Sequence, residues 1–442
     1  MKQFPLYSLA EHLKLPGSFD EVIQGYRIDS RKVEKGDLFF ALRGERTDGH
    51  EYLLEARSRG AWAAVVDRNY SGPDFGLKLL RVADVKEALQ SLARFSLELK
   101  RPFIVAITGS VGKTTTKEFV ATLLGGKYTV SKTHGSYNTQ LTLPLTILNR
   151  EDAEVLVLEM GISEPGEMER LVSIAPPDIA AITKIALAHA AFFPEGLDQI
   201  KREKQQIFSQ ANTKVAILPS GIDLPFTHLK KVYFSEIERE ADYFLSIADE
   251  RGLIDEKGIR AHKFDLPFKE THLLHNLLAA IAVARQMHLS WEEIDAQIPK
   301  LKLPKMRFEK LEKGGALLIN DAYNANPESM RAALANLPQP KEGGKRLAVL
   351  GEMRELGEFS KACHEELGYF ALKHVDHVLT FGGDASLIST IFADAQKPAE
   401  HFLDKGKLSE RLQELMRPGD VVLVKGSRSL GLEAVLNYLF ER

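Results

Sequence analysis

The sequence of 442 residues contains a single cysteine, Cys363. One thiol cannot form a disulfide within the chain, which fits a reducing compartment. No apolar run approaches the roughly 20 residues that a membrane-spanning helix needs. The first residues, MKQFPLYSLAEHL, lack the basic segment and the apolar core of a signal peptide. We therefore expect a cytoplasmic protein with no membrane span.

The chain also lacks an excess of positive charge. Its 58 lysine and arginine residues face 61 acidic residues, and the formal net charge is -3 at pH 7. Proteins that bind nucleic acids usually have a basic balance or a basic patch, so the composition gives no support for a nucleic-acid partner. With 44% hydrophobic and 27% charged residues, the composition is that of an ordinary soluble globular protein. The length predicts about two to four domains.

One stretch combines a strand, a glycine loop and a helix. Residues 103–107 are apolar and predict a buried strand, and apolar residues from Phe119 to Leu124 recur at helical spacing. Between them lie Gly109, Ser110, Val111, Gly112, Lys113, Thr114 and Thr115. Such a loop lets backbone N–H groups approach phosphate oxygens at a helix N-terminus. Lys113 can neutralise the terminal phosphates, and the Thr114 hydroxyl can ligate the magnesium that accompanies ATP.

The spacing of this loop departs from the common P-loop pattern. That pattern requires a glycine five residues before Gly112, where this chain has Ile107. The nearest glycine, Gly109, makes a shorter loop. An ordinary strand-to-helix turn would explain the glycines but not the adjacent lysine and threonines. The stretch therefore predicts nucleotide phosphate binding.

The residues before this stretch predict a small α/β unit. Strands are predicted at 26–29, 37–42 and 63–66, and helices at 53–59 and 89–99. Ser30, Arg31 and Arg43 lie at or near strand ends, where polar and basic groups could hold an anionic ligand. Solvated turns are the usual explanation for such residues. Arg101-Pro102 marks a domain boundary.

Two further α/β patterns follow. In the central part, strands are predicted at 103–107, 155–158, 179–185 and 215–218, and an amphipathic helix at 272–287. From Arg307 onward, strands are predicted at 316–319, 347–350, 377–381 and 421–424, and helices at 328–337, 361–372, 408–416 and 432–439. The first pattern predicts a largely parallel sheet. The second predicts a Rossmann-like doubly wound sheet without a dinucleotide fingerprint.

Polar residues near strand ends are candidates for chemistry. Glu159 ends a strand, where an acid faces the crevice of an open parallel sheet and could bind magnesium or cap the next turn. By residue type alone, His189 is better explained as a structural histidine and Lys204 as a solvated helix lysine. Asp321, followed by Asn324 and Asn326, could bind a polar ligand or form a turn and a helix cap. Both interpretations of that segment stay open.

Five segments resemble one family, the Mur ligases, which build the peptide stem of bacterial peptidoglycan. The segments are DSRKVEKGDLFFALRGERTDGH, TGSVGKTTTKE, YNANPESM, GEMRELGEFSKACH and LVKGSRS. The first resembles the family's uridine-nucleotide-binding domain, and the second its ATP loop with the short glycine spacing. The resemblance covers nearly the whole chain. Asn-Ala-Asn-Pro after Asp321 is similar to the family members that add D-alanyl-D-alanine, whereas members that add the third residue have a different motif there.

The resemblance implies an α/β protein of three domains. Residues 1–100 would bind a UDP-sugar, residues 101–304 would form a P-loop-type mononucleotide-binding parallel sheet for ATP, and residues 305–442 would form a Rossmann-like ligase domain that binds the incoming dipeptide. The implied reaction joins D-alanyl-D-alanine to UDP-N-acetylmuramoyl-tripeptide through an acyl phosphate, with ATP and Mg²⁺. The products would be UDP-N-acetylmuramoyl-pentapeptide for peptidoglycan synthesis, ADP and phosphate. We expect a cytoplasmic monomer.

The resemblance also assigns roles to particular residues. The residues it marks as catalytic are Lys113, His189, Lys204, Arg307 and Asp321. For ATP it adds Asn276 to the glycine loop, Arg307 and Asp321, and for magnesium it indicates Thr114, Glu159, His189 and Lys204. For the UDP substrate it indicates Ser30, Arg31, Arg43, Asn138 and Thr139, and for the dipeptide Tyr323, Asn324 and Asn326. Lys204 matches a lysine that is carbamoylated in the family, and a carbamate would be an anionic oxygen ligand.

Three positions depart from the family's pattern. Leu273 stands where an asparagine near adenine is usual, and Ser136 and Thr142 replace an asparagine and a glycine. Two other interpretations therefore stay open. One is a related amide ligase, such as a third-residue Mur ligase or a folylpolyglutamate synthase, and the other is a plain P-loop ATPase. The sequence does not determine the third residue of the tripeptide.

Overall fold

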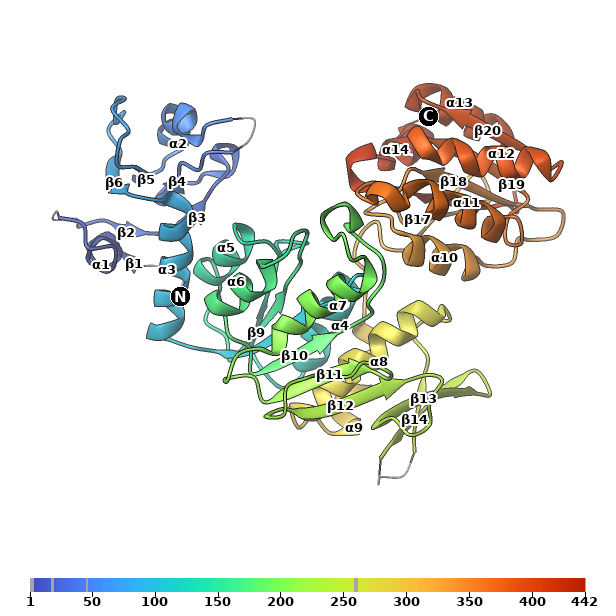
Figure 1. The fold of residues 1–442 in the computed structure, drawn as a ribbon, viewed down its shortest axis with the longest axis horizontal. Helices are drawn as coiled ribbons and strands as arrows, with labels where there is room; N and C mark the ends of the chain where they lie inside the picture. The colour runs from blue at the N-terminus through green and yellow to red at the C-terminus, as the bar shows by residue number, and fades with distance from the viewer. Residues whose placement is uncertain (1–3, 17–19, 45–46, 258–260, 442) are drawn as a thin grey trace.

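The computed structural model describes residues 4–16, 20–44, 47–257 and 261–441. These residues form α/β units around three large sheets that follow one another along the chain (Figure 1). The predicted α/β class with three units is confirmed. The assignment of a substrate to each unit stays a prediction. In this described part of the chain, no helix is both long and apolar enough to cross a lipid bilayer.

The N-terminal unit is built on a parallel sheet of four strands, in the order β3-β4-β5-β6. A short antiparallel pair, β1 with β2, lies beside it. The strands are β1 (Phe4–Pro5), β2 (Val22–Ile23), β3 (Gly25–Arg27), β4 (Asp37–Phe40), β5 (Ala63–Asp67) and β6 (Lys78–Val82). The helices are α1 (Leu6–His12), α2 (Leu53–Ser58) and α3 (Val85–Leu99). The sequence predicted β3, β4 and β5 but missed β6 and the short pair.

The central unit contains a sheet of nine strands, in the order β15-β14-β13-β12-β11-β10-β7-β9-β8. The strands are β7 (Phe103–Thr108), β8 (Val130–Lys132), β9 (Val155–Glu159), β10 (Ile179–Ile182), β11 (Val215–Pro219), β12 (Lys230–Ser235), β13 (Tyr243–Ala248), β14 (Arg251–Glu256) and β15 (His262–Asp265). The helices are α4 (Lys113–Leu124), α5 (Thr142–Leu148), α6 (Glu167–Ile174), α7 (Leu197–Gln205), α8 (Thr271–Gln286) and α9 (Trp291–Asp295). Only the pairs β13–β14 and β14–β15 are antiparallel, so the predicted largely parallel sheet is confirmed.

One predicted strand of this sheet was too long. The apolar pattern predicted a strand over 179–185, but β10 ends at Ile182. Lys184 instead forms an isolated antiparallel bridge with Val111 in the glycine loop. The extended segment after β10 therefore supports the glycine loop rather than extending the sheet.

The C-terminal unit contains a sheet of six strands, in the order β16-β17-β21-β18-β19-β20, and only the edge strand β16 is antiparallel. The strands are β16 (Glu309–Lys313), β17 (Ala316–Asn320), β18 (Arg346–Gly351), β19 (His377–Phe381), β20 (Ala399–Phe402) and β21 (Val421–Lys425). The helices are α10 (Pro327–Ala335), α11 (Ser360–Ala371), α12 (Ser386–Asp394), α13 (Lys405–Leu415) and α14 (Glu433–Glu441). The carboxyl ends of β17, β21 and β18 lie side by side and form an edge where open sheets bind ligands.

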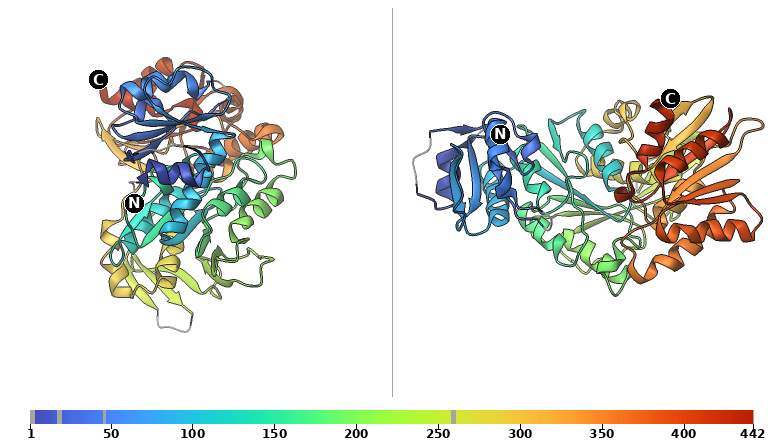
Figure 2. Two further views of the ribbon diagram at one scale, coloured as in Figure 1. Left: turned by 90° about the vertical axis from the view of Figure 1, so that its left-hand side faces the viewer. Right: turned by 90° about the horizontal axis from the view of Figure 1, so that it is seen from above.

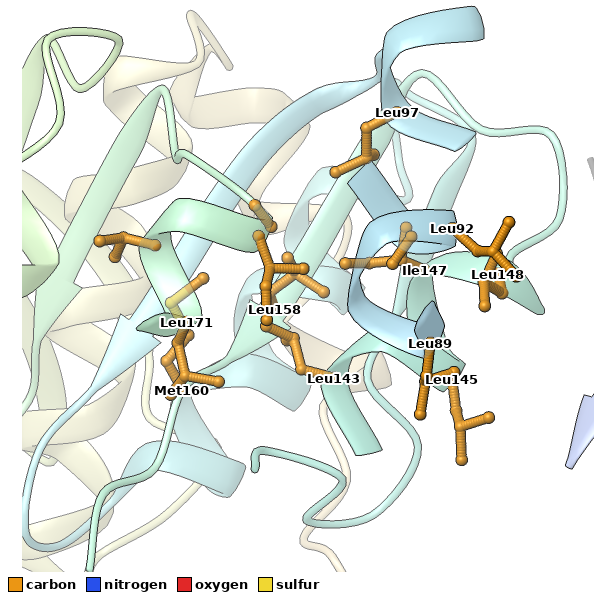
Figure 3. Close-up of a cluster of buried hydrophobic side chains, with 14 of the residues drawn as sticks. Leu89, Leu92, Leu97, Leu143, Leu145, Ile147, Leu148, Leu158, Met160 and Leu171 are labelled. Atoms are coloured by element: carbon orange, nitrogen blue, oxygen red, sulfur yellow. The ribbon is translucent and has the colours of Figure 1, made fainter. Parts of the chain in front are cut away.

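The hydrophobic core joins the first two units but not the third. One cluster of buried residues runs from the N-terminal sheet through α3 into α5 and the central sheet. Figure 3 shows Leu92 of α3 beside Ile147 and Leu148 of α5, and Leu89 of α3 beside Leu145 of α5. The C-terminal sheet has separate clusters on its two faces. The N-terminal and C-terminal units lie at opposite ends of the central unit (Figure 2).

Candidate active site

The glycine loop has a backbone that only glycine tolerates at two positions. Gly109 and Gly112 have φ values of 150° and 86°. A Cβ atom on Gly112 would lie 2.2 Å from Oδ1 of Asn276, and one on Gly109 would lie 2.0 Å from Oγ1 of Thr183. The loop is therefore packed tightly between β10 and α8, and a side chain at either glycine would displace it. The strand–loop–helix arrangement predicted for phosphate binding is present, with α4 beginning at Lys113.

Lys113 and Thr114 face the C-terminal unit. Nζ of Lys113 donates to the carbonyl oxygen of Gly109 over 2.8 Å. Burial and the nearby Arg307 lower the pKa of Lys113, while Glu159 opposes that shift. Nη2 of Arg307 lies 3.3 Å from Oγ1 of Thr114, so residues 193 positions apart in the sequence meet here. Cationic groups from two units thus converge on the start of α4, which suits a polyphosphate.

Glu159 is almost fully buried, with 1% of its surface exposed. Its Oε1 accepts a hydrogen bond from Nδ2 of Asn138 over 2.7 Å, and its Oε2 has no partner among the described residues. A buried carboxylate oxygen without a donor is suited to a cation that arrives with a ligand. Asn138 thus serves Glu159 in this structure, and its predicted contact with the UDP substrate stays a prediction.

His189 lies in the loop after β10 with a left-handed backbone, φ 55°. Its Nδ1 makes a hydrogen bond with Oε2 of Glu355 from the C-terminal unit, and this bond lowers the pKa of Glu355. A histidine whose Nδ1 is held by a carboxylate has its Nε2 free for a metal. Within the described ranges, no three His, Cys, Asp or Glu side chains form a preformed metal cluster. Glu159 and His189 fit Mg²⁺, which takes few protein ligands and keeps waters and substrate phosphates.

Lys204 is buried on α7, so the solvated-helix explanation for this residue is wrong. Only 3% of its surface is exposed. Burial lowers its pKa well below the usual value, and the positive charge of Lys113 lowers it further. The neutral amine is therefore favoured at this position. A neutral amine is the form that can add carbon dioxide.

Arg307 is held by the backbone conformation of its two neighbours and by an aromatic ring. Its neighbours Met306 and Phe308 have φ values of 59° and 54°, which bulky residues rarely adopt. The guanidinium carbon lies 4.0 Å from the ring centroid of Tyr323, and its buried Nε has no partner among the described atoms. Backbone strain of this kind is retained where the surrounding structure requires one conformation.

Asp321 follows β17 and forms a buried ion pair. Its Oδ2 lies 2.6 Å from Nζ of Lys425 at the end of β21, and its Oδ1 accepts from the backbone nitrogen of Phe308 over 3.0 Å. Burial lowers the pKa of Lys425, and the Asp321 carboxylate opposes the shift. Both carboxylate oxygens of Asp321 are therefore occupied, and its immediate effect is to hold the segment that carries Arg307.

The two asparagines after Asp321 differ in their contacts. Asn326 is the N-cap of α10, and its side chain accepts from the backbone nitrogen of Ser329 over 2.8 Å. The helix-cap interpretation is thus confirmed for Asn326. Oδ1 of Asn324 accepts from the next backbone nitrogen, and its carbonyl oxygen accepts from Lys425. Both asparagines nevertheless line a cavity.

That cavity has a volume of about 320 Å³ and lies between the central and C-terminal units. Its lining residues are Ser110, Lys113, Ala188, His189, Asn324, Ala325, Asn326, Arg354, Glu355, Leu356, Ser427, Arg428 and Ser429. Of this set, sequence reasoning assigned roles to Ser110, Lys113, His189, Asn324 and Asn326, and it missed Arg354, Glu355 and Ser429. The segments GEMREL and LVKGSRS, at the ends of β18 and β21, were the signal that could have found them.

A second cavity of about 760 Å³ lies next to the glycine loop. Val111, His275 and Asn276 line it, together with residues of α10 and β13. Leu273 does not line this cavity and is buried, with 2% of its surface exposed. Asn276 lies beside Gly112 and lines a cavity large enough for a nucleoside, and its contact with ATP stays a prediction.

A third cavity of about 780 Å³ lies between the N-terminal and central units. None of the five residues predicted to bind the UDP substrate lines it; its polar residues include Arg27, Lys32, Tyr137 and Asn149. Sequence reasoning missed these residues, because their proximity depends on the packing of the two units.

The five predicted residues have other partners in this structure. The hydroxyl of Ser30 donates to Glu55, Arg31 pairs with Asp29, and Arg43 pairs with Asp48. Oγ1 of Thr139 lies 3.0 Å from Oγ1 of Thr142. Their role in binding stays a prediction.

Comparisons with known proteins agree along the whole chain. Residues 107–284 match the Mur ligase middle domain, residues 306–428 the Mur ligase glutamate ligase domain, and residues 22–96 the catalytic domain of the Mur ligase family. The UDP-N-acetylmuramoyl-tripeptide–D-alanyl-D-alanine ligase of Bacillus subtilis is 34% identical over 436 residues, which cover 95% of this chain and 94% of that protein.

Two solved structures are similar over nearly the full length. One is MurF from Acinetobacter baumannii, with a TM-score of 0.86, 28% identity and full coverage of both chains. The other is MurF ligase from Thermotoga maritima in complex with ADP, with a TM-score of 0.77 and 32% identity, covering 94% of this chain and 97% of that one.

Proposed function

The chain belongs to the Mur ligase family, and from this we propose that it joins D-alanyl-D-alanine to UDP-N-acetylmuramoyl-tripeptide with consumption of ATP. The observation that carries the proposal is a single cavity, at which the phosphate loop of the central unit meets the strand-end loops of the C-terminal unit. Full-length relatives with this activity in their names support the choice of substrates. The product would be UDP-N-acetylmuramoyl-pentapeptide, a precursor of peptidoglycan.

The chemistry requires activation of a carboxylate, which is a poor electrophile. Phosphoryl transfer from ATP to the tripeptide carboxylate forms an acyl phosphate and ADP. The amine of the dipeptide then attacks the acyl carbon, and the tetrahedral intermediate releases phosphate. Lys113, at the N-terminus of α4, and Arg307, beside Thr114, place positive charge where the phosphates carry negative charge.

We propose that the magnesium ion that accompanies ATP is held by Thr114, Glu159 and His189. The free Oε2 of Glu159 and the Nδ1 contact of His189 with Glu355 support this assignment. When bound, the ion would neutralise phosphate charge. The low pKa of Lys204 supports carbamoylation of this residue, which would supply an additional anionic oxygen. The ADP complex of the Thermotoga relative supports ATP as the nucleotide.

We also propose a division of labour among the three units. Residues 1–100 would bind the UDP-sugar, residues 101–304 the ATP and residues 305–442 the dipeptide. The cavities at the two boundaries between units support this division. The free, buried thiol of Cys363 supports action in the cytoplasm. We propose a monomer because each catalytic group named above lies on one chain.

The direct test measures phosphate release from ATP and Mg²⁺ with UDP-N-acetylmuramoyl-tripeptide, with and without D-alanyl-D-alanine. We expect phosphate release that requires both UDP-N-acetylmuramoyl-tripeptide and D-alanyl-D-alanine. Mass spectrometry should identify the pentapeptide product. Tripeptides ending in lysine and in diaminopimelate are compared in parallel. Phosphate release without the dipeptide would indicate a plain ATPase. An amide product that forms only with an amine other than D-alanyl-D-alanine would indicate a related amide ligase.

A further inference from the structure

The charges around the 320 Å³ cavity are arranged in two groups. Arg354 and Arg428 contribute guanidinium groups from the loops after β18 and β21. Glu355 contributes the one carboxylate among the described lining residues, and it lies against His189 of the central unit. Lys113 of the phosphate loop lines the opposite side, where the proposed function places the phosphates. The two arginines are therefore the cations left for the carboxylate of a small zwitterion, and the single lining carboxylate lies at the boundary with the central unit.

The two arginine loops are held together by their backbones. Gly351 and Gly426 end or follow neighbouring strands, and a Cβ atom on Gly351 would lie 3.1 Å from the Cα atom of Gly426. The backbone nitrogen of Arg354 donates to Oγ of Ser427 over 2.8 Å. Nη1 of Arg354 donates to Oγ of Ser429 over 3.3 Å. These contacts place both loops before any ligand arrives.

Both guanidinium groups keep donors available. Arg354 has one acidic neighbour, Glu352 at 3.3 Å, and Arg428 has one, Glu433 at 2.7 Å. About half of each side chain is exposed, 50% and 53% respectively. Because a guanidinium group carries five N–H donors, one acidic neighbour leaves several for a second carboxylate.

We propose that Arg354 and Arg428 bind the terminal carboxylate of the incoming dipeptide and so set its direction in the cavity. This inference rests on the proposed function. The carboxylate end lies against the C-terminal wall, and the amine end points toward Glu355, His189 and the phosphate loop, where the acyl carbon must be. The volume of about 320 Å³ is at the small end for ligand sites, which suits a dipeptide.

The orientation has a chemical consequence. The amine must approach the acyl carbon while the carboxylate, which is itself a possible nucleophile, is kept away from it. Two arginines on the far wall attract the carboxylate and so keep it away from the acyl carbon. The amine is then the end of the dipeptide that lies near the phosphate loop. Arg354 and Arg428 are therefore specificity-determining residues for an acceptor with a free carboxylate.

The first experiment changes the protein. Arg354→Gln and Arg428→Gln remove the charge while keeping a long polar side chain. We expect the KM for D-alanyl-D-alanine to rise about ten- to a hundredfold in each variant, the loss expected for one charge-assisted contact. The KM values for ATP and for UDP-N-acetylmuramoyl-tripeptide should stay within about twofold of the wild type. The matched control is Arg411→Gln, which removes an arginine of α13 that pairs with Glu400 of β20 and Glu414 of α13 and does not line the cavity.

The second experiment changes the ligand and needs no variant. D-alanyl-D-alaninamide has the same amine but no carboxylate, so the wild type should use it about ten- to a hundredfold less efficiently in kcat/KM. In the two arginine variants this discrimination should fall toward unity. Equal use of both dipeptides by the wild type would overturn the inference while leaving the ligase activity established. A rise in the KM for ATP instead would overturn it in favour of a phosphate contact. No pentapeptide from the wild type would overturn the proposed function and the inference together.

Discussion

At the scale of single residues, the site contains buried lysines in two different situations. Lys425 forms an ion pair with the carboxylate of Asp321, whereas for Lys204 only the charge of the adjacent Glu203 opposes the effects of burial and of Lys113. Burying an ammonium without a close ion-pair partner is costly, so burial shifts the equilibrium of Lys204 toward the neutral amine. Such a residue is better suited to reaction than to structural support.

We predict that ligase activity depends on dissolved carbon dioxide through Lys204. Because burial lowers the pKa of Lys204, the uncharged amine, which is the form that adds carbon dioxide, becomes easier to reach, and its product is an anionic carbamate. Removal of bicarbonate should lower kcat, and its return should restore activity. Lys204→Ala should lower kcat by about a hundredfold, in the range found when one stabilising group is removed. Activity of the variant at the wild-type level would contradict a catalytic role. Lys201→Ala, on the same helix, is the control.

His364 leads to a prediction about pH. Its Nε2 accepts from the backbone nitrogen of Met353 over 2.9 Å, and its Nδ1 donates to the carbonyl oxygen of Ser360 over 2.7 Å. Burial lowers the pKa of His364, although Asp384 and Glu352 oppose the shift. The unfolded chain therefore binds a proton before the native state does as pH falls below about 6.5. This group makes the free energy of unfolding decrease as pH decreases through that range.

His364→Ala should remove this pH dependence. At pH 8 the free energy of unfolding of the variant should be about 1–3 kcal/mol lower than that of the wild type, because the backbone N–H of Met353 loses its acceptor. Below pH 6.5 the difference in the free energy of unfolding should shrink. In the wild type, the native state resists protonation of His364 while the unfolded chain takes up the proton, and the variant lacks this group. Urea unfolding of both proteins across this pH range measures the difference. A constant difference would contradict the assignment.

At the scale of elements, the loop between β7 and α4 shows why its glycines are needed. Gly112 and Gly343 both have left-handed backbones, with φ values of 86° and 78°. A Cβ atom on Gly112 would clash with Asn276, whereas one on Gly343 would have nothing within 4 Å. The two positions thus share a left-handed backbone that would strain any other residue, and they differ in the space around them.

This difference predicts the outcome of two matched substitutions. Gly112→Ala should raise the KM for ATP at least about tenfold, because the clash shifts the loop away from the phosphates. Gly343→Ala should cause backbone strain alone, a loss of about 1 kcal/mol in stability with an unchanged KM for ATP. Steady-state kinetics and thermal unfolding of both variants provide the comparison. Equal kinetic effects would mean that strain, not the clash, is responsible.

The elements also show where sequence reasoning succeeds. The strand–loop–helix around Lys113 was predictable because its signal is local, in glycine spacing and apolar periodicity. The strands from β12 to β15 were missed because they are short and interrupted by charges, as in KKVYFS and RGLIDE. The burial of Lys204 was missed because its helix, LDQIKREKQ, reads as solvated. Contacts such as His189 with Glu355 have no signal in residue spacing, since they join two units.

At the scale of the whole molecule, the site is divided between units. Arg307 reaches Thr114, Lys184 pairs with Glu328, and His189 pairs with Glu355 across the boundary between the central and C-terminal units. A substrate anchored in the N-terminal unit must also extend to this boundary. Under the proposed division of substrates, catalysis would therefore require all three units to hold their ligands at once.

We predict that ligands bring the units closer together. Small-angle scattering should show a smaller radius of gyration with a non-hydrolysable ATP analogue, UDP-N-acetylmuramoyl-tripeptide and D-alanyl-D-alanine present together. Each ligand alone should have a smaller effect. The same measurement on Arg307→Gln, which loses the contact with Thr114, should show less compaction. An unchanged radius with all ligands bound would contradict closure.

The continuous core through α3 and α5 has a thermodynamic consequence. Since the N-terminal and central sheets share one hydrophobic cluster, neither can melt without exposing the core of the other. The C-terminal sheet has its own clusters and meets the central unit largely through polar contacts, so it can melt alone. Calorimetry should thus resolve two transitions rather than three. D-alanyl-D-alanine alone should raise the midpoint temperature of only the transition that belongs to the C-terminal unit.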